Sequence, residues 1–375
     1  MTDRMPTAPR PHIHAHTALR GLAALLVVGY HLRFGANPLL GVEEATRLFE
    51  RGYLWVDFFF LLSGFVLCYV YAPGGLPDGA ATLRFYRARI ARVWPLHVLT
   101  LAFLVAFSLL TIAYETVTGS PGSAYAPPYE HLPLQLFLVH AWGVLDRTSW
   151  NVPSWSISTE LFAYLLFPVL LWLLRRGGAG FVAIAVAASA AFYLWIGRTT
   201  GDLDITVGVA LLRCLAGFVL GMALYRLAPL TDRVNGAPLA LAQAASIVLI
   251  LYCIERVPND AVLIAPFAAL VLLTARDRGP ISRALSAGWL RRLGEWSYAI
   301  YLTHLPIKIA LGFVFERAAR ALGVDGEVGT RIVWILLVYA VTILVSALVY
   351  ERFEKPARRA LLGQRPRPAA PVPAP

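Results

Sequence analysis

Charged residues are scarce in this chain. Only 15% of its 375 residues are Asp, Glu, Lys or Arg, whereas 58% are hydrophobic, and the mean hydropathy is +0.64. Soluble domains usually carry about 25% charged and about 45–50% apolar residues. The composition therefore excludes an ordinary water-soluble domain and predicts a protein that lies in a lipid bilayer.

Cysteines, repeats and targeting signals are also few or absent. The three cysteines, Cys68, Cys214 and Cys253, all lie in apolar segments without metal-type spacing, so we expect no metal site and treat them as small apolar residues. The N-terminus lacks the pattern of a cleavable signal peptide, and no internal repeat or appended soluble domain is visible. We expect one membrane unit.

Long apolar runs are what the sequence has instead. A helix needs roughly 17–25 predominantly apolar residues to cross a bilayer. The runs predict an all-α integral membrane protein with about ten transmembrane helices, near residues 18–36, 53–72, 94–114, 154–174, 179–197, 207–228, 236–255, 259–275, 297–316 and 330–350. The run 131–142 is too short to cross and is expected to be re-entrant or interfacial.

The arginines predict the orientation. The net charge of +11 is shared among segments between the apolar runs and is not gathered on a soluble domain, so it does not indicate nucleic acid binding. Segments rich in arginine stay in the cytoplasm, and here they are 84–92, 276–295 and the tail after Glu351. Both termini are therefore predicted to be cytoplasmic, with an N-terminal segment 1–15 and a disordered Pro/Ala-rich tail 358–375.

Ionisable residues inside a membrane are functional candidates because they are costly there. Eleven helical steps separate Arg20 from His31, which places the two side chains about 16 Å apart along the axis and within about 20° of one face. Glu160 and Lys308 reach a depth similar to that of His31 from other spans, so a mid-membrane polar site is geometrically feasible. The ionisable residues well inside the predicted spans are His31, Asp57, Glu160, Arg213, His304 and Lys308.

An arginine cluster, "RFYRARIARVWPLH", lies where the third predicted span meets the cytoplasm. Arg89 and Arg92 share a helical face, whereas Arg87 lies about 160° from Arg89. Guanidinium groups suit phosphate recognition. The cluster would therefore fit a cytosolic donor that carries several phosphates.

Each of these groups also has a purely structural interpretation. The arginines could serve only as a cytoplasmic anchor, and His31 could hydrogen-bond to a neighbouring helix. Glu160 and Lys308 could each belong to a structural ion pair, and Asp57 could bind a backbone group at a helix end.

Six short motifs follow the order found in the acyltransferase-3 family of integral membrane O-acyltransferases, which the sequence resembles over about residues 16–357. The resemblance implies a single membrane acyltransferase domain at 16–357, of the stand-alone type without an appended hydrolase-like domain, in the cytoplasmic membrane of a bacterium. The motifs are "RGLA" followed by His31, "VDFFFLLSGFVL", "YRARIARVWPLH", "VPSWSISTELFAYLLFP", "LGEWSYAIYLTHLPI" and "YERFEKPAR".

The resemblance also implies an activity. Family members transfer an acyl group, usually acetyl from acetyl-CoA, to a hydroxyl of a sugar, a glycan or an antibiotic such as a macrolide. The expected partners are acyl-CoA, a hydroxylated acceptor and the lipid bilayer, and we allow for a homodimer. No nucleic acid and no metal are expected.

On this basis we assign roles to the candidate residues. His31 is predicted to be the general base, or alternatively a transiently acylated nucleophile, and Glu160 to support its imidazole or to bind the acceptor. The phosphates of acyl-CoA are assigned to Arg20, Arg87, Arg89 and Arg92. The candidates for contacts with the oxyanion or the acceptor are Asp57, Ser156, Tyr298, His304 and Lys308.

Two rival functions are weighed against this one. A polytopic transporter or flippase would use the buried ionisable groups as a proton relay, but the paired broken helices of repeated halves that many transporters show are not visible. A family member that kept the fold and lost its activity is the other rival. The Arg20–His31 spacing and Glu160 argue against that loss.

Overall fold

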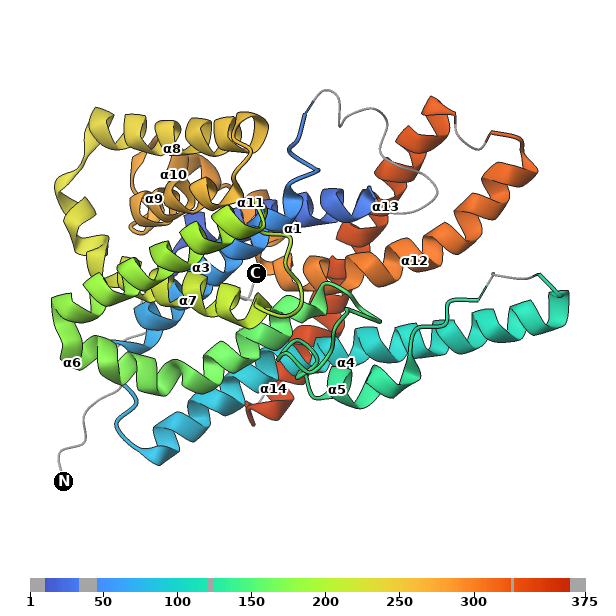
Figure 1. Cartoon of the computed structure of the whole chain (residues 1–375), viewed down its shortest axis with the longest axis horizontal. Helices are drawn as coiled ribbons and strands as arrows, with labels where there is room; N and C mark the ends of the chain where they lie inside the picture. Colours follow the sequence, from blue (N-terminus) through green and yellow to red (C-terminus); the bar gives the residue numbers. More distant parts are fainter. Residues whose placement is uncertain (1–10, 34–45, 121–123, 325–326, 365–375) are drawn as a thin grey trace, which may run out of the picture.

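The computed structural model describes residues 11–33, 46–120, 124–324 and 327–364, and within these ranges every regular element is helical (Figure 1). The prediction of an all-α protein is confirmed. The α-helices are α1 (His14–Leu32), α3 (Trp55–Tyr71), α4 (Gly79–Thr118), α5 (Leu132–Leu136), α6 (Ser154–Thr199), α7 (Ala210–Leu227), α8 (Gly236–Arg256), α9 (Ile264–Thr274), α10 (Gly279–Leu285), α11 (Gly288–Glu295), α12 (Ser297–Ala321), α13 (Val328–Val349) and α14 (Lys355–Leu361).

Seven helical segments in the described ranges are long and apolar enough to cross a membrane, as expected of a multi-pass membrane protein. Each predicted span coincides with a helix over its described residues, and the last three residues of the span 18–36 lie outside them. α6 contains two of the predicted spans, because Gly178, with φ 51° and ψ −126°, breaks its helical path in a region of backbone space that glycine enters without strain. The two predicted spans within α6 count as one of the seven segments, and the more polar α1 and the shorter α9 are not among the seven, which together account for the difference from ten. Ten crossings and cytoplasmic termini stay a prediction.

The arginine cluster is helical, although most of it precedes the predicted span at 94–114. α4 begins at Gly79, ahead of the cluster, and continues for 40 residues to Thr118. The Asp78 carboxylate caps its first turn by accepting from the Ala81 amide at 2.6 Å. Alanine, leucine and arginine favour helix, so the apolar span and the polar segment before it form one continuous rod.

The short apolar run 131–142 does not form a span. Its helix α5 has only five residues, about 7.5 Å of rise. Beyond α5 the chain is held against the start of α6, where the Trp142 indole donates to the Ser158 carbonyl at 2.8 Å and the Ala141 amide donates to the Ser158 hydroxyl at 3.1 Å. A re-entrant or interfacial position in the bilayer stays a prediction.

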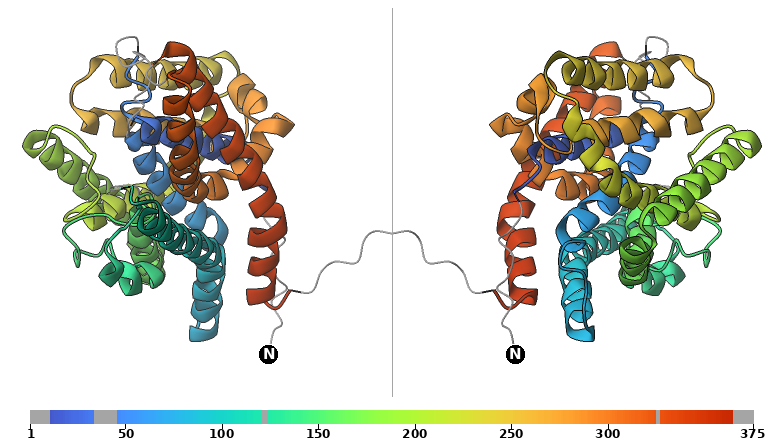
Figure 2. Two further views of the ribbon diagram at one scale, coloured as in Figure 1. Left: turned by 90° about the vertical axis from the view of Figure 1, so that its right-hand side faces the viewer. Right: turned by 90° about the vertical axis from the view of Figure 1, so that its left-hand side faces the viewer.

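α1 runs through the middle of the molecule and packs against α3, α11 and α12 (Figures 1 and 2). α3 in turn packs closely along α7. A Cβ atom on Gly64 of α3 would lie 1.9 Å from the Phe218 carbonyl oxygen, and one on Gly221 of α7 would lie 2.0 Å from the Leu61 carbonyl oxygen. Two glycines therefore allow these helices to meet backbone to backbone.

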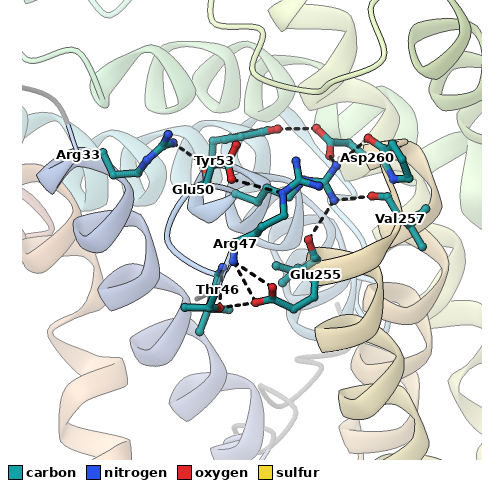
Figure 3. A network of polar contacts seen from close by, with 12 residues as sticks. Arg33, Thr46, Arg47, Glu50, Tyr53, Glu255, Val257 and Asp260 are labelled. Carbon is teal, nitrogen blue, oxygen red and sulfur yellow. Dashed lines mark hydrogen bonds and ion pairs between the residues drawn. The ribbon is translucent and has the colours of Figure 1, made fainter. Parts of the chain in front are cut away.

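A polar network ties the segment before α3 to the end of α8 (Figure 3). The Arg47 amide donates to the Glu255 carboxylate, and the Tyr53 hydroxyl donates to Asp260 at 2.6 Å. The buried Arg51 donates to the Val257 carbonyl at 2.6 Å and pairs with Asp260 at 2.9 Å. A cation that binds the last carbonyls of a helix is stabilised by the helix dipole. The network therefore fixes the segment before α3 to the end of α8, on the predicted outer side.

The predicted terminal segments lie partly outside the described residues. α1 begins at His14, and residues 1–10 and 365–375 are not described. The first residues of the predicted disordered tail are helical, because α14 extends to Leu361. α14 lies beside the start of α4, where the Arg87 Nε donates to the Leu361 carbonyl at 2.7 Å.

Candidate active site

Side chains from five helices surround one cavity of about 110 Å³, which we call the arginine cavity. Most of its apolar wall comes from α3, which also contributes Ser63, and the other polar groups come from α1, α4, α6 and α12. The structure thus brings together residues that are far apart in the chain. The predicted site residues that line it are Arg20, Arg89, Arg92, Ser156, Glu160 and Tyr298.

The arginine cavity is rich in positive charge. Three guanidinium groups line it together with one carboxylate, that of Glu160. Among the described residues, neither Arg20 nor Arg89 has a hydrogen-bond acceptor. The guanidinium carbon of Arg89 instead lies 5.9 Å from the ring centres of Phe85 and Tyr164. The Nε of Arg89 is buried without an acceptor, which is costly for a charged group, so the cavity favours binding of an anion.

Arg92 is held by Glu354, which was not predicted as a site residue. Arg92 Nη1 pairs with Glu354 Oε1, and its guanidinium lies 5.0 Å from the centre of the Tyr298 ring. Glu354 is 3% exposed and ends a π-helical turn between α13 and α14, a rare geometry that is frequent at functional sites. The motif "YERFEKPAR" contains Glu354, but the contact with Arg92 depends on how the helices pack.

His31 and His304 face each other from α1 and α12. His304 Nδ1 lies 3.1 Å from the Ile300 carbonyl oxygen, and its Nε2 lies 3.2 Å from His31 Nδ1. A carbonyl only accepts, so His304 Nδ1 carries the hydrogen and its Nε2 is the acceptor. His31 Nδ1, also 2.9 Å from the Val27 carbonyl oxygen, must then be the donor. The network assigns the basic lone pair of neutral His31 to Nε2.

Tyr301 joins the arginine cavity to the histidine pair. It lines the cavity, and its hydroxyl lies 2.7 Å from the Ser156 hydroxyl. Its ring centre is 6.1 Å from that of His304, which follows it on α12. Less than one turn of helix therefore separates the wall of the cavity from the paired imidazoles.

Lys308 lies at His31 and not at Glu160. Its ammonium donates to the His31 carbonyl oxygen at 2.7 Å. In the described part of the chain no ion pair joins Lys308 to Glu160, and a structural ion pair of either residue with another partner stays a prediction.

Two predicted site residues are placed elsewhere. Arg87 points to α14 and does not line the arginine cavity. Asp57 is fully buried and pairs with Arg213 at 2.6 Å, while the Tyr193 hydroxyl donates to it at 3.1 Å. The Asp57 carboxylate therefore has a charged structural partner, not the backbone partner that the sequence suggested.

The arrangement combines two chemical capacities. The arginine cavity can hold an anionic group at guanidinium donors, and the histidine pair can accept a proton about 16 Å further along α1. A substrate long enough to span both would place its reacting end at His31.

Comparison with known proteins gives the family. Residues 13–351 match the family described as an acyltransferase domain. Acyltransferase MdmB of Streptomyces mycarofaciens is 29% identical over 391 residues, which cover 96% of this chain and 95% of MdmB. Protein 2 in picA locus of Rhizobium radiobacter is 42% identical over 90 residues, or 24% of this chain and 42% of that protein.

A longer relative matches over a similar stretch. Peptidoglycan O-acetyltransferase OatA of Listeria monocytogenes is 23% identical over 384 residues, which cover 93% of this chain and 56% of OatA. No solved structure matches the chain. Because the family match spans most of its length, the chain belongs to the acyltransferase-3 family and is an acyltransferase-family enzyme.

Proposed function

We propose that the protein is an O-acyltransferase that moves an acetyl group from acetyl-CoA to a hydroxyl of a sugar, a glycan or a hydroxylated natural product. The observation that supports it most is the arginine cavity, in which Arg20 and Arg89 lack acceptors near a histidine pair. The relative named as a peptidoglycan O-acetyltransferase supports an acetyl group and a glycan hydroxyl.

The donor would lie along α1. Arg20, Arg89 and Arg92 would bind its phosphates, because planar guanidinium groups match phosphate oxygens in pairs. From Arg20 the helix rises about 16 Å to His31, so an extended arm attached to those phosphates would carry the thioester to the imidazole. A ten-span topology would place the phosphates toward the cytoplasm, where acyl-CoA is found.

The reaction needs one proton transfer. The acceptor oxygen forms a bond to the thioester carbonyl carbon, and the carbon–sulfur bond breaks. His31 Nε2 takes the hydroxyl proton and returns it to the departing thiolate, so the products are an ester and a thiol. His304, through the 3.2 Å contact between the rings, and the Val27 carbonyl at 2.9 Å would both favour the required tautomer of His31.

The developing oxyanion needs a donor as well. Tyr298 is less suited, because its hydroxyl hydrogen is directed to the Val93 carbonyl. Lys308 is placed best, since its ammonium carries three N–H groups and lies at the His31 backbone. Glu160 lies in the arginine cavity away from His31, which favours a contact with the acceptor over support of the imidazole.

The test is transfer from labelled acetyl-CoA to a panel of hydroxylated acceptors by the purified protein in lipid nanodiscs, followed by mass spectrometry. We expect His31→Ala to lower transfer by about 10²–10⁴-fold while coenzyme A still binds. Arg89→Ala should raise the KM for acetyl-CoA by about tenfold, the loss of one charge-assisted contact.

Arg87→Ala is the matched control, because Arg87 lies on the same helix but outside the cavity. Arg87→Ala should leave both the rate of transfer and the KM for acetyl-CoA unchanged. An active His31→Ala protein, or an Arg89→Ala protein in which only the KM for the acceptor changes, would contradict the assignment.

A further inference from the structure

A second cavity of about 670 Å³ adjoins the arginine cavity. Arg20 and Val66 line both. From Arg20 the lining of the second cavity follows α1 toward its N-terminus and the preceding Pro11. From Val66 it follows α3 toward its C-terminus and the following Gly75. The second cavity therefore lies on the side of Arg20 away from His31. Its volume is in the range of small-molecule sites, far above the roughly 30 Å³ of one water.

The walls of the second cavity suit a flat, polar, anionic ligand. Several lining residues carry rings, among them His12, Tyr69 and Tyr71, and no Asp or Glu lines it among the described residues. Arg20 is the charged residue at its inner end. At its rim the Arg175 guanidinium lies beside Gly75, where a Cβ atom would be 2.0 Å from Arg175 Nη1. Guanidinium groups therefore lie at both ends of the second cavity, whose walls between them are uncharged.

The N-terminus of α1 is not available to bind an anion in the second cavity. The Asp277 carboxylate accepts from the amides of His14 and Ala15 at 2.7 and 2.8 Å. These are the amides that would otherwise attract a phosphate. An anionic ligand in the second cavity is therefore directed to the guanidinium groups.

A buried histidine also lies in the wall of the second cavity. His16 is 2% exposed, and its Nε2 lies 3.0 Å from the Val271 carbonyl oxygen. Nε2 must donate there, so Nδ1 is an acceptor, and it has no partner in the described part of the chain. Because Nδ1 is itself buried, His16 forms part of the wall of the cavity and does not offer this nitrogen to a ligand.

We infer that the second cavity binds the adenosine part of acyl-CoA. The inference rests on the proposed function, because it requires acyl-CoA as the donor. The diphosphate lies at Arg20 and the neighbouring arginines, the base lies among the rings, and the phosphate on the ribose lies toward Arg175. The pantetheine arm then enters the arginine cavity on the other side of Arg20.

Gly74 offers a way to fill this cavity without disturbing the fold. It lines the second cavity, and a Cβ atom there would meet no atom within 4 Å. Gly79 has equally open surroundings but lines neither cavity. Gly74→Trp is therefore the test variant and Gly79→Trp the matched control, each as the full chain in nanodiscs.

The measurement is calorimetric binding of two probes, coenzyme A and 4′-phosphopantetheine, which lacks the nucleotide. Gly74→Trp should weaken coenzyme A about tenfold or more, equal to about 1.4 kcal/mol, and leave 4′-phosphopantetheine unchanged. Gly79→Trp should change neither Kd, whereas Arg89→Ala should weaken both probes.

Three results would overturn the inference. If Gly74→Trp binds coenzyme A as tightly as the wild type, the nucleotide lies elsewhere. If it weakens both probes equally, the cavity does not distinguish the nucleotide from the arm. If the unmodified protein binds neither probe, the donor assignment of the proposed function fails first, and the adenosine site fails with it.

Discussion

Each tautomer of a neutral histidine leaves a different nitrogen free to act as a base, and the Val27 carbonyl and His304 together favour the tautomer of His31 that carries its hydrogen on Nδ1. The contacts from Ile300 through His304 to His31 assign every ring hydrogen in turn. The helical arithmetic that put Arg20 and His31 on one face used only the sequence. The partnership of His31 with His304 joins residues 273 positions apart, and no local pattern encodes it.

His304 should therefore act as a positioning residue. Phe at this position keeps the ring but removes the acceptor, so His304→Phe is expected to lower kcat by about 10–100-fold, the size seen when an orienting partner of a histidine is removed. The KM for acetyl-CoA should stay unchanged. His304→Gln, which keeps a side-chain acceptor, should recover part of kcat in the same transfer assay. Equal losses in both variants would mean that His304 only fills space.

At the scale of helices, glycine sets how closely α3 and α7 pack. Gly217 and Gly221 form a G-x-x-x-G pattern on α7, and Gly64 faces it from α3. The contact lies beside the buried Asp57–Arg213 pair on the same two helices, and Arg213 also lies over Trp155 of α6 at 5.3 Å. The close approach thus holds the wall of α3 that lines the arginine cavity.

Gly221→Ala should destabilise the protein. Its Cβ atom would lie 2.0 Å from the Leu61 carbonyl oxygen, so the helices must move apart, and overpacking of this kind costs about 1–3 kcal/mol. Gly312→Ala is the matched control, because its nearest neighbour is 3.6 Å away and alanine favours helix by up to about 1 kcal/mol. Unfolding in sodium dodecyl sulfate measures both, and equal midpoints for the two variants would contradict the packing argument.

At the scale of the whole molecule, the ten-span prediction fixes the side of each loop. The segment 276–295 contains five arginines and is predicted to be cytoplasmic, whereas 317–329 is predicted to lie outside. The cationic residues of both cavities belong to the predicted cytoplasmic half, which agrees with a donor made in the cytoplasm. The orientation and the donor are therefore linked hypotheses.

Two glycines make the orientation testable. Gly288 and Gly329 have no atom within 4 Å of an added Cβ, and the native cysteines are all buried, so new cysteines should label above a low background. In intact spheroplasts a membrane-impermeant maleimide should label Gly329→Cys, and it should label Gly288→Cys only after lysis. The reverse pattern would invert the predicted topology.

The sequence by itself determined the class of the protein, the positions of its apolar helices and the shared face of Arg20 and His31, because hydropathy and helical period act along the chain. Only the tertiary structure decided that Arg89, Glu160 and Tyr298 meet at one cavity, that Glu354 binds Arg92 and that Arg87 turns away. Helices in a bilayer are apolar on most sides, so their periodicity gives little information about neighbours. The order of the bundle comes from steric fit at glycines and from pairing of buried charges, which act between distant residues.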